Sequence, residues 1–286
     1  RASRTFYRGS VHLIYQSQID ILIEPSFGHT PGQRLDVMAH RPAPLQVTFY
    51  PSTTGLKSTF DYRFTDYYLD PSTQSSLSTE PLLHLPLPRS VLCYTPPDEK
   101  LPLSHLPANH TGYITFGSFN QTSKINPKVI ETWSQILHQI PESRLFLKNR
   151  TFHCEITRKH FISLFQTEGI ALERLYFCAS LRDRQEHFQT YAQMDIALDT
   201  FPYNGHTTTC EALWMGVPVI VLAGDLHFGR VAMGFLAILG LDEFIAHSEQ
   251  EYIDRAVALA QDREKLSVLR ATMRERIHKS VLCDGA

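Results

Sequence analysis

The second half of the sequence alternates short apolar runs with longer segments in which apolar residues recur at helical spacing. The runs have the length and the Val, Ile, Leu and Phe content of buried strands, and they lie at 113–116, 144–148, 175–178, 194–199 and 217–222. Strands that alternate with helices predict right-handed βαβ units and a parallel sheet. A half of this kind is Rossmann-like, and its ligands bind at the carboxyl ends of the strands. We therefore expect a site in the loops that follow the strands.

The helices between these strands are marked by a cap and by apolar periodicity. Asn126 stands before Pro127, which places an N-cap residue ahead of a proline at the first helical position. From 129 to 140 the apolar residues repeat at helical spacing, so one face of this helix is expected to be buried. Further helices are expected around 161–165, 184–192, 207–215, 252–260 and 266–277.

The first part of the chain has a less regular pattern. A short helix is expected at 34–40, with strands at 20–23, 45–49 and 62–65. Residues 67–110 contain eight prolines and many serines and threonines, which predicts an irregular connector between two α/β lobes. We expect a partial N-terminal lobe with its connector at 1–108 and a C-terminal lobe at 109–286. Because the chain begins with Arg1 and stops just after a helix, we expect a fragment whose first lobe is truncated and whose second lobe is complete.

Composition argues against several classes of protein. With 27 Lys plus Arg and 29 Asp plus Glu, the formal net charge is −2, which argues against nucleic acid as a partner. No apolar run reaches the ~18 residues that a membrane helix needs, so no membrane partner is expected. The five cysteines are an odd number without C-x-x-C spacing, which argues against a disulfide framework and favours a cytoplasmic protein.

The densest group of candidate residues lies in 198–216, where a strand ends, a loop turns and three threonines open a helix. Backbone N–H groups and hydroxyls at a helix start favour an anion, and His206 stands at the entrance. Glu211, one turn inside, has the chemistry to hold a ribose diol. The alternative is structural: Thr207 or Thr208 caps the helix, and Glu211 completes a capping box.

Two further segments also follow strands. In 116–124, Lys124 has the reach to contact a diphosphate, although neither a GxxxxGK[ST] nor a GxGxxG pattern is present; the alternative is a solvated lysine near a helix start. In 182–187, Arg184 or His187 has the shape to pack on a base, and the alternative is a solvated helix face. Spacing alone leaves both choices open.

The sequence carries no motif for a metal or for a serine nucleophile. The patterns H-E-x-x-H, D-x-D and G-x-S-x-G are all missing from it. If the ligand is a nucleotide diphosphate, protein cations and helix-end amides must therefore take the place of a metal ion. We expect neither a metal site nor a cofactor.

Several long motifs, in order along essentially the whole chain, resemble the O-linked N-acetylglucosamine transferases and the plant SPINDLY proteins. The motifs are Arg41-Pro-Ala-Pro-Leu-Gln46, Tyr50-Pro-Ser-Thr-Thr-Gly-Leu56, Asp61-Tyr-Arg-Phe-Thr-Asp66, Phe116-Gly-Ser-Phe-Asn-Gln121 with Lys124, and Asp199 through Gly216. The resemblance implies a GT-B glycosyltransferase, with two Rossmann-like lobes and a cleft between them. It also implies inverting, metal-independent transfer of a sugar from a nucleotide to Ser or Thr hydroxyls of proteins.

The motif positions imply roles for individual residues on the phosphate side. Gln121 and Lys124 match the diphosphate contacts of the family. His206, Thr207 and Thr208 match the loop that cradles the β-phosphate side. Lys124 and His206 are the expected catalytic residues, because the resemblance places them nearest to the departing diphosphate.

The ribose and base contacts are implied in the same way. Glu211 matches an acidic ribose ligand, and Arg184 and His187 match nucleobase contacts. His206 resembles the N-acetylglucosamine enzymes and favours UDP-GlcNAc as the donor, whereas the loop around Tyr50 resembles SPINDLY and favours GDP-fucose. We expect UDP-GlcNAc, with GDP-fucose as the alternative.

The resemblance further implies a protein or peptide acceptor and tetratricopeptide repeats upstream of this region. Two other functions remain as alternatives. A degenerate nucleotide-binding module without turnover would explain why the loop around Tyr50 is shorter than in the family. A UDP-sugar epimerase of the same two-lobed shape would need a catalytic His and carboxylate set that we do not find.

Overall fold

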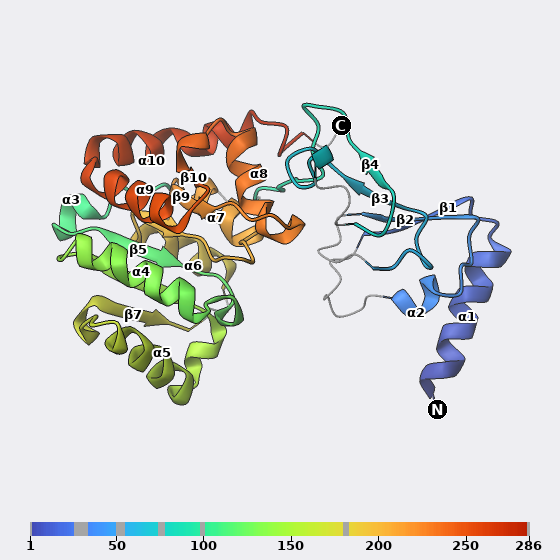
Figure 1. The fold of residues 1–286 in the computed structure, drawn as a ribbon, viewed down its shortest axis with the longest axis horizontal. Helices are drawn as coiled ribbons and strands as arrows, with labels where there is room; N and C mark the ends of the chain where they lie inside the picture. Colours follow the sequence, from blue (N-terminus) through green and yellow to red (C-terminus); the bar gives the residue numbers. More distant parts are fainter. Residues whose placement is uncertain are drawn as a thin grey trace. The chain divides into compact units, whose positions relative to one another are not determined.

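The computed structural model describes residues 2–25, 34–49, 55–73, 78–97, 101–179 and 183–284. The chain forms two compact units, Arg1–Val91 and Leu92–Ala286 (Figure 1). Each unit contains its own parallel β-sheet, which confirms the expected α/β class with two Rossmann-like lobes. The loop around Tyr50 lies outside the described residues.

The first unit is built on four parallel strands that follow one another in sequence order across the sheet. The elements are α1 (Ala2–Gln16), β1 (Ile21–Glu24), α2 (Leu35–Met38), β2 (Leu45–Phe49), β3 (Tyr62–Thr65) and β4 (Leu82–His84). Arg63 on β3 forms a buried ion pair with Asp70 at 3.1 Å. The Asp66 carboxylate accepts hydrogen bonds from the N–H groups of Leu69 and Val91, so carboxylates hold the chain that follows β3.

Two elements of the first unit differ from the sequence prediction. Strand β4 lies inside 67–110, where the prolines predicted only irregular chain, and it pairs with β3 from Arg63↔Leu82 to Thr65↔His84. The strand was missed because three residues are too few for an alternating pattern to be recognised. Helix α1 was missed because its segment combines Gly9 with few strong helix formers.

The second unit contains six parallel strands in a doubly wound order. They are β5 (Thr115–Ser118), β6 (Arg144–Lys148), β7 (Leu175–Cys178), β8 (Ile196–Leu198), β9 (Val219–Leu222) and β10 (Ile245–Ala246). Across the sheet the order is β7-β6-β5-β8-β9-β10, so the chain winds outward from β5 in one direction and from β8 in the other. The topological switch point, where such folds bind ligands, lies between β5 and β8.

The helices of this unit cover the sheet as the apolar periodicity predicts. They are α3 (Ala108–Thr111), α4 (Pro127–Gln139), α5 (Glu155–Thr167), α6 (Arg184–Gln189), α7 (Thr207–Trp214), α8 (Val231–Ile238), α9 (Glu249–Gln261) and α10 (Arg263–His278). The Asn126 side chain accepts from the N–H of Val129 at 3.0 Å, which confirms the predicted cap of α4. Helix α4 packs against α5 and α9 (Figure 1) and buries Trp133 in the core. No helix among the described residues is long and apolar enough to cross a bilayer.

All strands and helices expected for 113–277 are present, some with displaced ends, whereas α8 and β10 were not expected. Residues 92–97 and 101–107 are packed with the second unit, because Arg270 donates to the carbonyl of Ser104 at 3.0 Å and Arg274 to that of Leu101 at 2.6 Å. Gly216 joins α7 to β9 with a φ of +77°, and a Cβ there would lie 2.5 Å from the Arg270 carbonyl oxygen. Only glycine fits this junction without strain.

Candidate functional site

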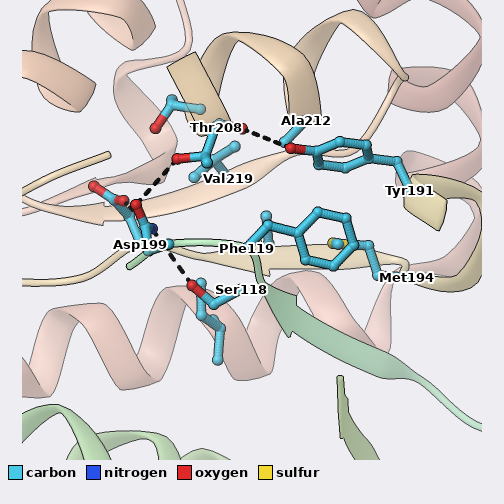
Figure 2. A pocket seen from close by; sticks show the side chains of 12 residues that line it. Ser118, Phe119, Tyr191, Met194, Asp199, Thr208, Ala212 and Val219 are labelled. Carbon is cyan, nitrogen blue, oxygen red and sulfur yellow. Dashed lines mark hydrogen bonds between the residues drawn. The ribbon is translucent and has the colours of Figure 1, made fainter. Parts of the chain in front are cut away.

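A small hollow opens at the switch point between β5 and β8 (Figure 2). Its volume is about 20 Å³, roughly the room that one water molecule needs. The hollow is therefore too small to enclose a whole ligand. Its lining comes from the ends of β5 and β8, from the turn before β8, from α7 and from β9: Ser118, Phe119, Asn120, Tyr191, Met194, Ala197, Leu198, Asp199, Thr208, Thr209, Ala212 and Val219.

Asp199 follows β8 directly and is buried in the lining of this hollow (Figure 2). Its Oδ1 accepts from the N–H of Gly205 at 2.8 Å and from Nδ2 of Asn120 at 3.0 Å, while Oδ2 has no hydrogen-bond partner among the described residues. Burial raises the pKa of Asp199 to about 6, although its hydrogen bonds and the nearby Lys124 act in the opposite direction. One carboxylate thus joins the loop after β5 to the loop after β8.

Lys124 is half-buried and reaches from the loop after β5 to the loop after β8. Its Nζ donates to the carbonyl oxygen of Asn204 at 2.7 Å and lies 4.2 Å from the centre of the Tyr203 ring. Burial lowers the pKa of Lys124, and the charge of Asp199 partly offsets this effect. An ammonium has three N–H donors, and only one of these has a hydrogen-bond acceptor in the described part of the chain. The other two are available to an anion.

The first turn of α7 also carries unused donors. His206 precedes the helix without capping it through its side chain, and the N–H groups of Thr207 and Thr208 have no hydrogen-bond partner within the described residues. The Thr208 hydroxyl donates to Oδ1 of Asn120 at 3.0 Å, which ties this turn to the loop after β5. The capping-box alternative is wrong, because neither threonine caps the helix and Glu211 bonds elsewhere.

His206 packs against an apolar neighbour at the entrance of this turn. Its ring lies 5.2 Å from the ring of Phe235, and its Nδ1 lies 3.4 Å from the hydroxyl of Thr207. Burial and the charge of Lys124 lower the pKa of His206 to about 4. The imidazole is therefore neutral near pH 7 and can donate or accept a hydrogen bond without adding a second positive charge.

A second polar cluster connects β6, α6 and α7. His187 Nε2 lies 2.9 Å from Oε2 of Glu211, and the Tyr191 hydroxyl donates to the same oxygen at 3.0 Å. Lys148, the last residue of β6, places Nζ 2.7 Å from Nδ1 of His187 and donates to the hydroxyl of Thr190 at 3.0 Å. Burial lowers the pKa of Lys148 to about 8. Oε1 of Glu211 has no hydrogen-bond partner in the described ranges.

Two expected residues stand apart from both clusters. Gln121 is exposed, and its Oε1 accepts only a long bond, 3.4 Å, from Nδ2 of Asn149. Arg184 is exposed at the first position of α6, with its guanidinium 5.8 Å from the ring of Phe188. Neither is hydrogen-bonded to the two clusters in the residues that the structure describes.

Asn120, Tyr191 and Lys148 belong to the two clusters but were not predicted from the sequence, and Asp199 was predicted only as part of the segment 198–216. Asp199 and Lys148 are polar residues where buried strands end, which was the available signal, since this is the edge where such sheets bind ligands. No sequence pattern pointed to Asn120 or Tyr191, because their roles depend on hydrogen-bond partners far away in the sequence.

Two units, each with its own parallel sheet and the second with a doubly wound strand order, define an α/β protein of the GT-B type. The sucrose-phosphate synthase of Thermosynechococcus elongatus shares this fold at 14% identity, with a TM-score of 0.64 over 96% of this chain and 72% of that one. At such low identity the likeness concerns the fold alone.

The chain belongs to glycosyl transferase family 41, whose sequence profile matches residues 104–285. A probable UDP-N-acetylglucosamine–peptide N-acetylglucosaminyltransferase SPINDLY of Solanum lycopersicum is 44% identical over 96% of this chain. A mutant of the Thermobaculum terrenum O-GlcNAc transferase is 34% identical, with a TM-score of 0.86 over 96% of this chain and 52% of that one. These similarities confirm the resemblance drawn from the motifs. The chain spans 29% of the length of the tomato protein.

Proposed function

We propose that this chain is the catalytic region of a protein O-glycosyltransferase that moves N-acetylglucosamine from UDP-GlcNAc to Ser or Thr hydroxyls. Membership of family 41 supports the class of reaction. The tomato relative, named for UDP-N-acetylglucosamine and peptide, supports the donor and the acceptor. The observation that carries the proposal is that Lys124 donates to the carbonyl oxygen of Asn204, in the loop that leads into the first turn of α7.

The costly charge in such a transfer develops on the departing diphosphate. Two N–H donors of Lys124 and the backbone N–H groups of Thr207 and Thr208, none of which has an acceptor among the described residues, would stabilise this charge, each well-placed donor contributing roughly 3 kcal/mol. The dipole of α7 acts in the same direction. Gln121, on the exposed rim, would add a contact to the diphosphate. Protein donors thereby supply the charge stabilisation for which other transferases use a metal ion, and the transfer is proposed to invert the anomeric carbon.

His206 would act beside Lys124 as a neutral group. Because the pKa of His206 is lowered to about 4, its imidazole does not compete with Lys124 for the negative charge at pH 7. It would instead donate one hydrogen bond on the β-phosphate side of the donor. Since this bond strengthens as charge builds on the phosphate oxygens, it contributes more to the transition state than to the ground state.

The ribose and the base would lie along the second cluster. The unpartnered Oε1 of Glu211 is the natural acceptor for a ribose hydroxyl, while Oε2 remains held by His187 and Tyr191. Arg184 and His187, three residues apart on α6, share one face of that helix and would flank the base. The hollow itself is too small for a base, so the nucleotide would lie across its mouth.

The remaining parts of the proposal concern the longer protein. A protein acceptor and upstream tetratricopeptide repeats rest on the resemblance to SPINDLY and O-GlcNAc transferases. A cytoplasmic location rests on the cysteine pattern. The lobe boundary expected near 108 rests on the proline-rich segment 67–110, whereas the two compact units divide between Val91 and Leu92. Two other functions are weighed by experiment: a GDP-fucose-dependent protein O-fucosyltransferase, and a nucleotide-binding module without turnover.

The test is donor-dependent modification of peptides, measured by mass spectrometry. The chain is incubated with Ser/Thr peptides and with UDP-GlcNAc or GDP-fucose, in the presence of a chelator. A mass gain of N-acetylhexosamine from UDP-GlcNAc supports the proposal. A mass gain of fucose from GDP-fucose would show that the donor is GDP-fucose and not UDP-GlcNAc. Nucleotide binding without any transfer overturns the assignment of catalysis to this chain.

A further inference from the structure

We infer that Lys148 is a positioning residue for the nucleotide site: it fixes the tautomer of His187 and thereby orients Glu211. Nothing in the sequence motifs assigned this lysine a role. The tautomer of His187 is inferred from hydrogen bonds alone. Only the identity of the ligand, a nucleotide bound by the oriented Glu211, rests on the proposed function.

The first step is that every donor of Lys148 is used. The side chain is buried, with the residue 3% exposed. Its Nζ lies within hydrogen-bond distance of three acceptors: Nδ1 of His187 at 2.7 Å, the hydroxyl of Thr190 at 3.0 Å and the carbonyl oxygen of His187 at 3.2 Å. The Thr190 hydroxyl donates its own hydrogen bond to the carbonyl oxygen of Glu186 at 2.8 Å. It must therefore accept from Lys148, so one N–H of the ammonium is left for Nδ1.

The second step concerns the imidazole. An ammonium has no lone pair and can only donate, so Nδ1 of His187 must be the unprotonated nitrogen. The ring proton then sits on Nε2, which points at Oε2 of Glu211 at 2.9 Å. Lys148 thus places the N–H of His187 opposite the Glu211 carboxylate, which needs a donor. A hydrogen-bond partner fixes the tautomer of a metal-binding histidine in the same way.

The third step concerns Glu211. Nε2 of His187 and the Tyr191 hydroxyl both donate to Oε2, so this oxygen is fully occupied and the carboxylate cannot rotate freely. Oε1 has no hydrogen-bond partner among the described residues, so its acceptor sites remain for a ligand. Because both ring nitrogens of His187 are occupied, this residue can offer a base only its ring face. It therefore contributes stacking and no polar contact that would distinguish uracil from guanine.

The other groups around Lys148 leave this arrangement intact at neutral pH. Cys178 on β7 and Glu211 on α7 both favour its charged form, and the Phe119 ring lies 4.7 Å from Nζ. Burial raises the pKa of Cys178 and that of Tyr191, so both stay protonated when Lys148 begins to lose its proton near pH 8. Above that pH Nζ is an amine with two N–H donors and one lone pair, so it can accept a hydrogen bond from Nδ1–H as well as donate one to Nδ1, and the tautomer is no longer imposed.

The test uses ¹⁵N-labelled ligand-free chain and reads the two ring nitrogens of His187 by NMR. We expect the Nε2–H tautomer alone at pH 7, and a mixture in Lys148→Met and in wild type above pH 8. Lys148→Arg, which keeps the charge and the donors, should restore the single tautomer. Lys159→Met, which removes an exposed lysine that forms an ion pair with Glu155, is the matched control and should change nothing.

The functional readout is nucleotide affinity at pH 7, measured by calorimetry with UDP and with GDP. Losing the imposed tautomer should weaken binding about tenfold in Lys148→Met, as expected for a hydrogen bond to a charged group, with recovery in Lys148→Arg. An unchanged tautomer in a folded Lys148→Met variant overturns the inference, and so does a changed tautomer with unchanged affinity. If wild type binds neither nucleotide, the proposed function fails, while the NMR result still decides the role of Lys148.

Discussion

The two halves of the candidate site each contain a lysine near the end of a neighbouring strand, and the two lysines are bonded in opposite ways. After β5, Lys124 donates one hydrogen bond to a carbonyl, and its other two donors have no acceptor in the part of the chain that the structure describes. At the end of β6, Lys148 has all three N–H donors within hydrogen-bond distance of acceptors in His187 and Thr190. Both ammonium groups are buried enough for their pKa to be lowered.

This difference separates a group that binds from a group that positions. A desolvated cation with unused donors is costly unless an anion completes its shell, which is why we propose Lys124 as the diphosphate ligand. A desolvated cation with a complete shell holds its neighbours in one arrangement, as Lys148 does for His187 and Glu211.

The largest effect is expected from Lys124→Met. Removing the only cation between the two loops, among the described residues, should weaken UDP or GDP binding about 100-fold, which corresponds to roughly 3 kcal/mol for a well-placed donor to developing charge. Calorimetry measures the loss, and circular dichroism checks that the fold is kept. Equal affinity in the variant and the wild type would mean that the anion lies elsewhere.

A pH-dependent effect is expected from Asp199→Asn. The pKa of Asp199 is raised from 3.8 to about 6, so the folded state binds this proton more tightly than the unfolded chain does. The ionised carboxylate therefore costs stability above pH 6, and that cost disappears as the pH falls toward 4. The free energy of unfolding of wild type, relative to the variant, should rise by about 2 kcal/mol between pH 7 and pH 4.

His206 should contribute with the opposite sign. Its pKa is lowered to about 4, so stability is lost as the pH falls below 6.5. Because His206 is present in both proteins, the difference between wild type and Asp199→Asn isolates the carboxylate. Urea unfolding at several pH values measures the free energy of unfolding of wild type and of Asp199→Asn. If the difference between the two proteins does not change with pH, the raised pKa of Asp199 is contradicted.

A smaller effect is expected from Gly205→Ala. The added Cβ would lie 2.6 Å from the Thr209 hydroxyl and 2.8 Å from Oδ1 of Asp199, so the loop must shift at a cost of about 1.5 kcal/mol. Gly9→Ala is the matched control, because a Cβ at Gly9 meets nothing within 4 Å. Thermal unfolding of the two variants should differ, and equal midpoints would show that the loop tolerates the methyl group.

The smallest effect is expected from Thr208→Val. The variant keeps the shape of the side chain but loses the hydrogen bond to Oδ1 of Asn120, which should lower the free energy of unfolding by about 1 kcal/mol. Thr272→Val, on the exposed face of α10, should change stability less. If Thr272→Val lowers the free energy of unfolding more than Thr208→Val does, the hydrogen bond between Thr208 and Asn120 contributes little to stability.

The sequence predicted the second unit well because its signals are local. Apolar runs, the Asn126 cap and helical periodicity determine where β6, β7 and α4 lie, and each depends on neighbouring residues only. Strand β4 and helix α8 were missed for the same reason, since three strand residues or a helix buried on all sides leave no periodic signature.

The site was predictable only in part. The motif positions selected Lys124, His206 and Thr208, and hydrogen bonds and charge interactions place these three around Asn120, Asn204 and Asp199. The capping-box alternative for Glu211 was wrong because its real partners, His187 and Tyr191, lie about twenty residues away in sequence. Pairings of this kind depend on the fold and cannot be read from spacing.

The most direct test of the account compares nucleotides with and without their phosphates. UDP and uridine, and GDP and guanosine, are titrated into the wild-type chain by calorimetry with a chelator present. If Lys124 and the first turn of α7 hold the diphosphate, the nucleotide should bind at least about 100-fold more tightly than its nucleoside, as charge-assisted contacts predict. Equal affinities, or a difference that requires added metal ion, would contradict the central claim.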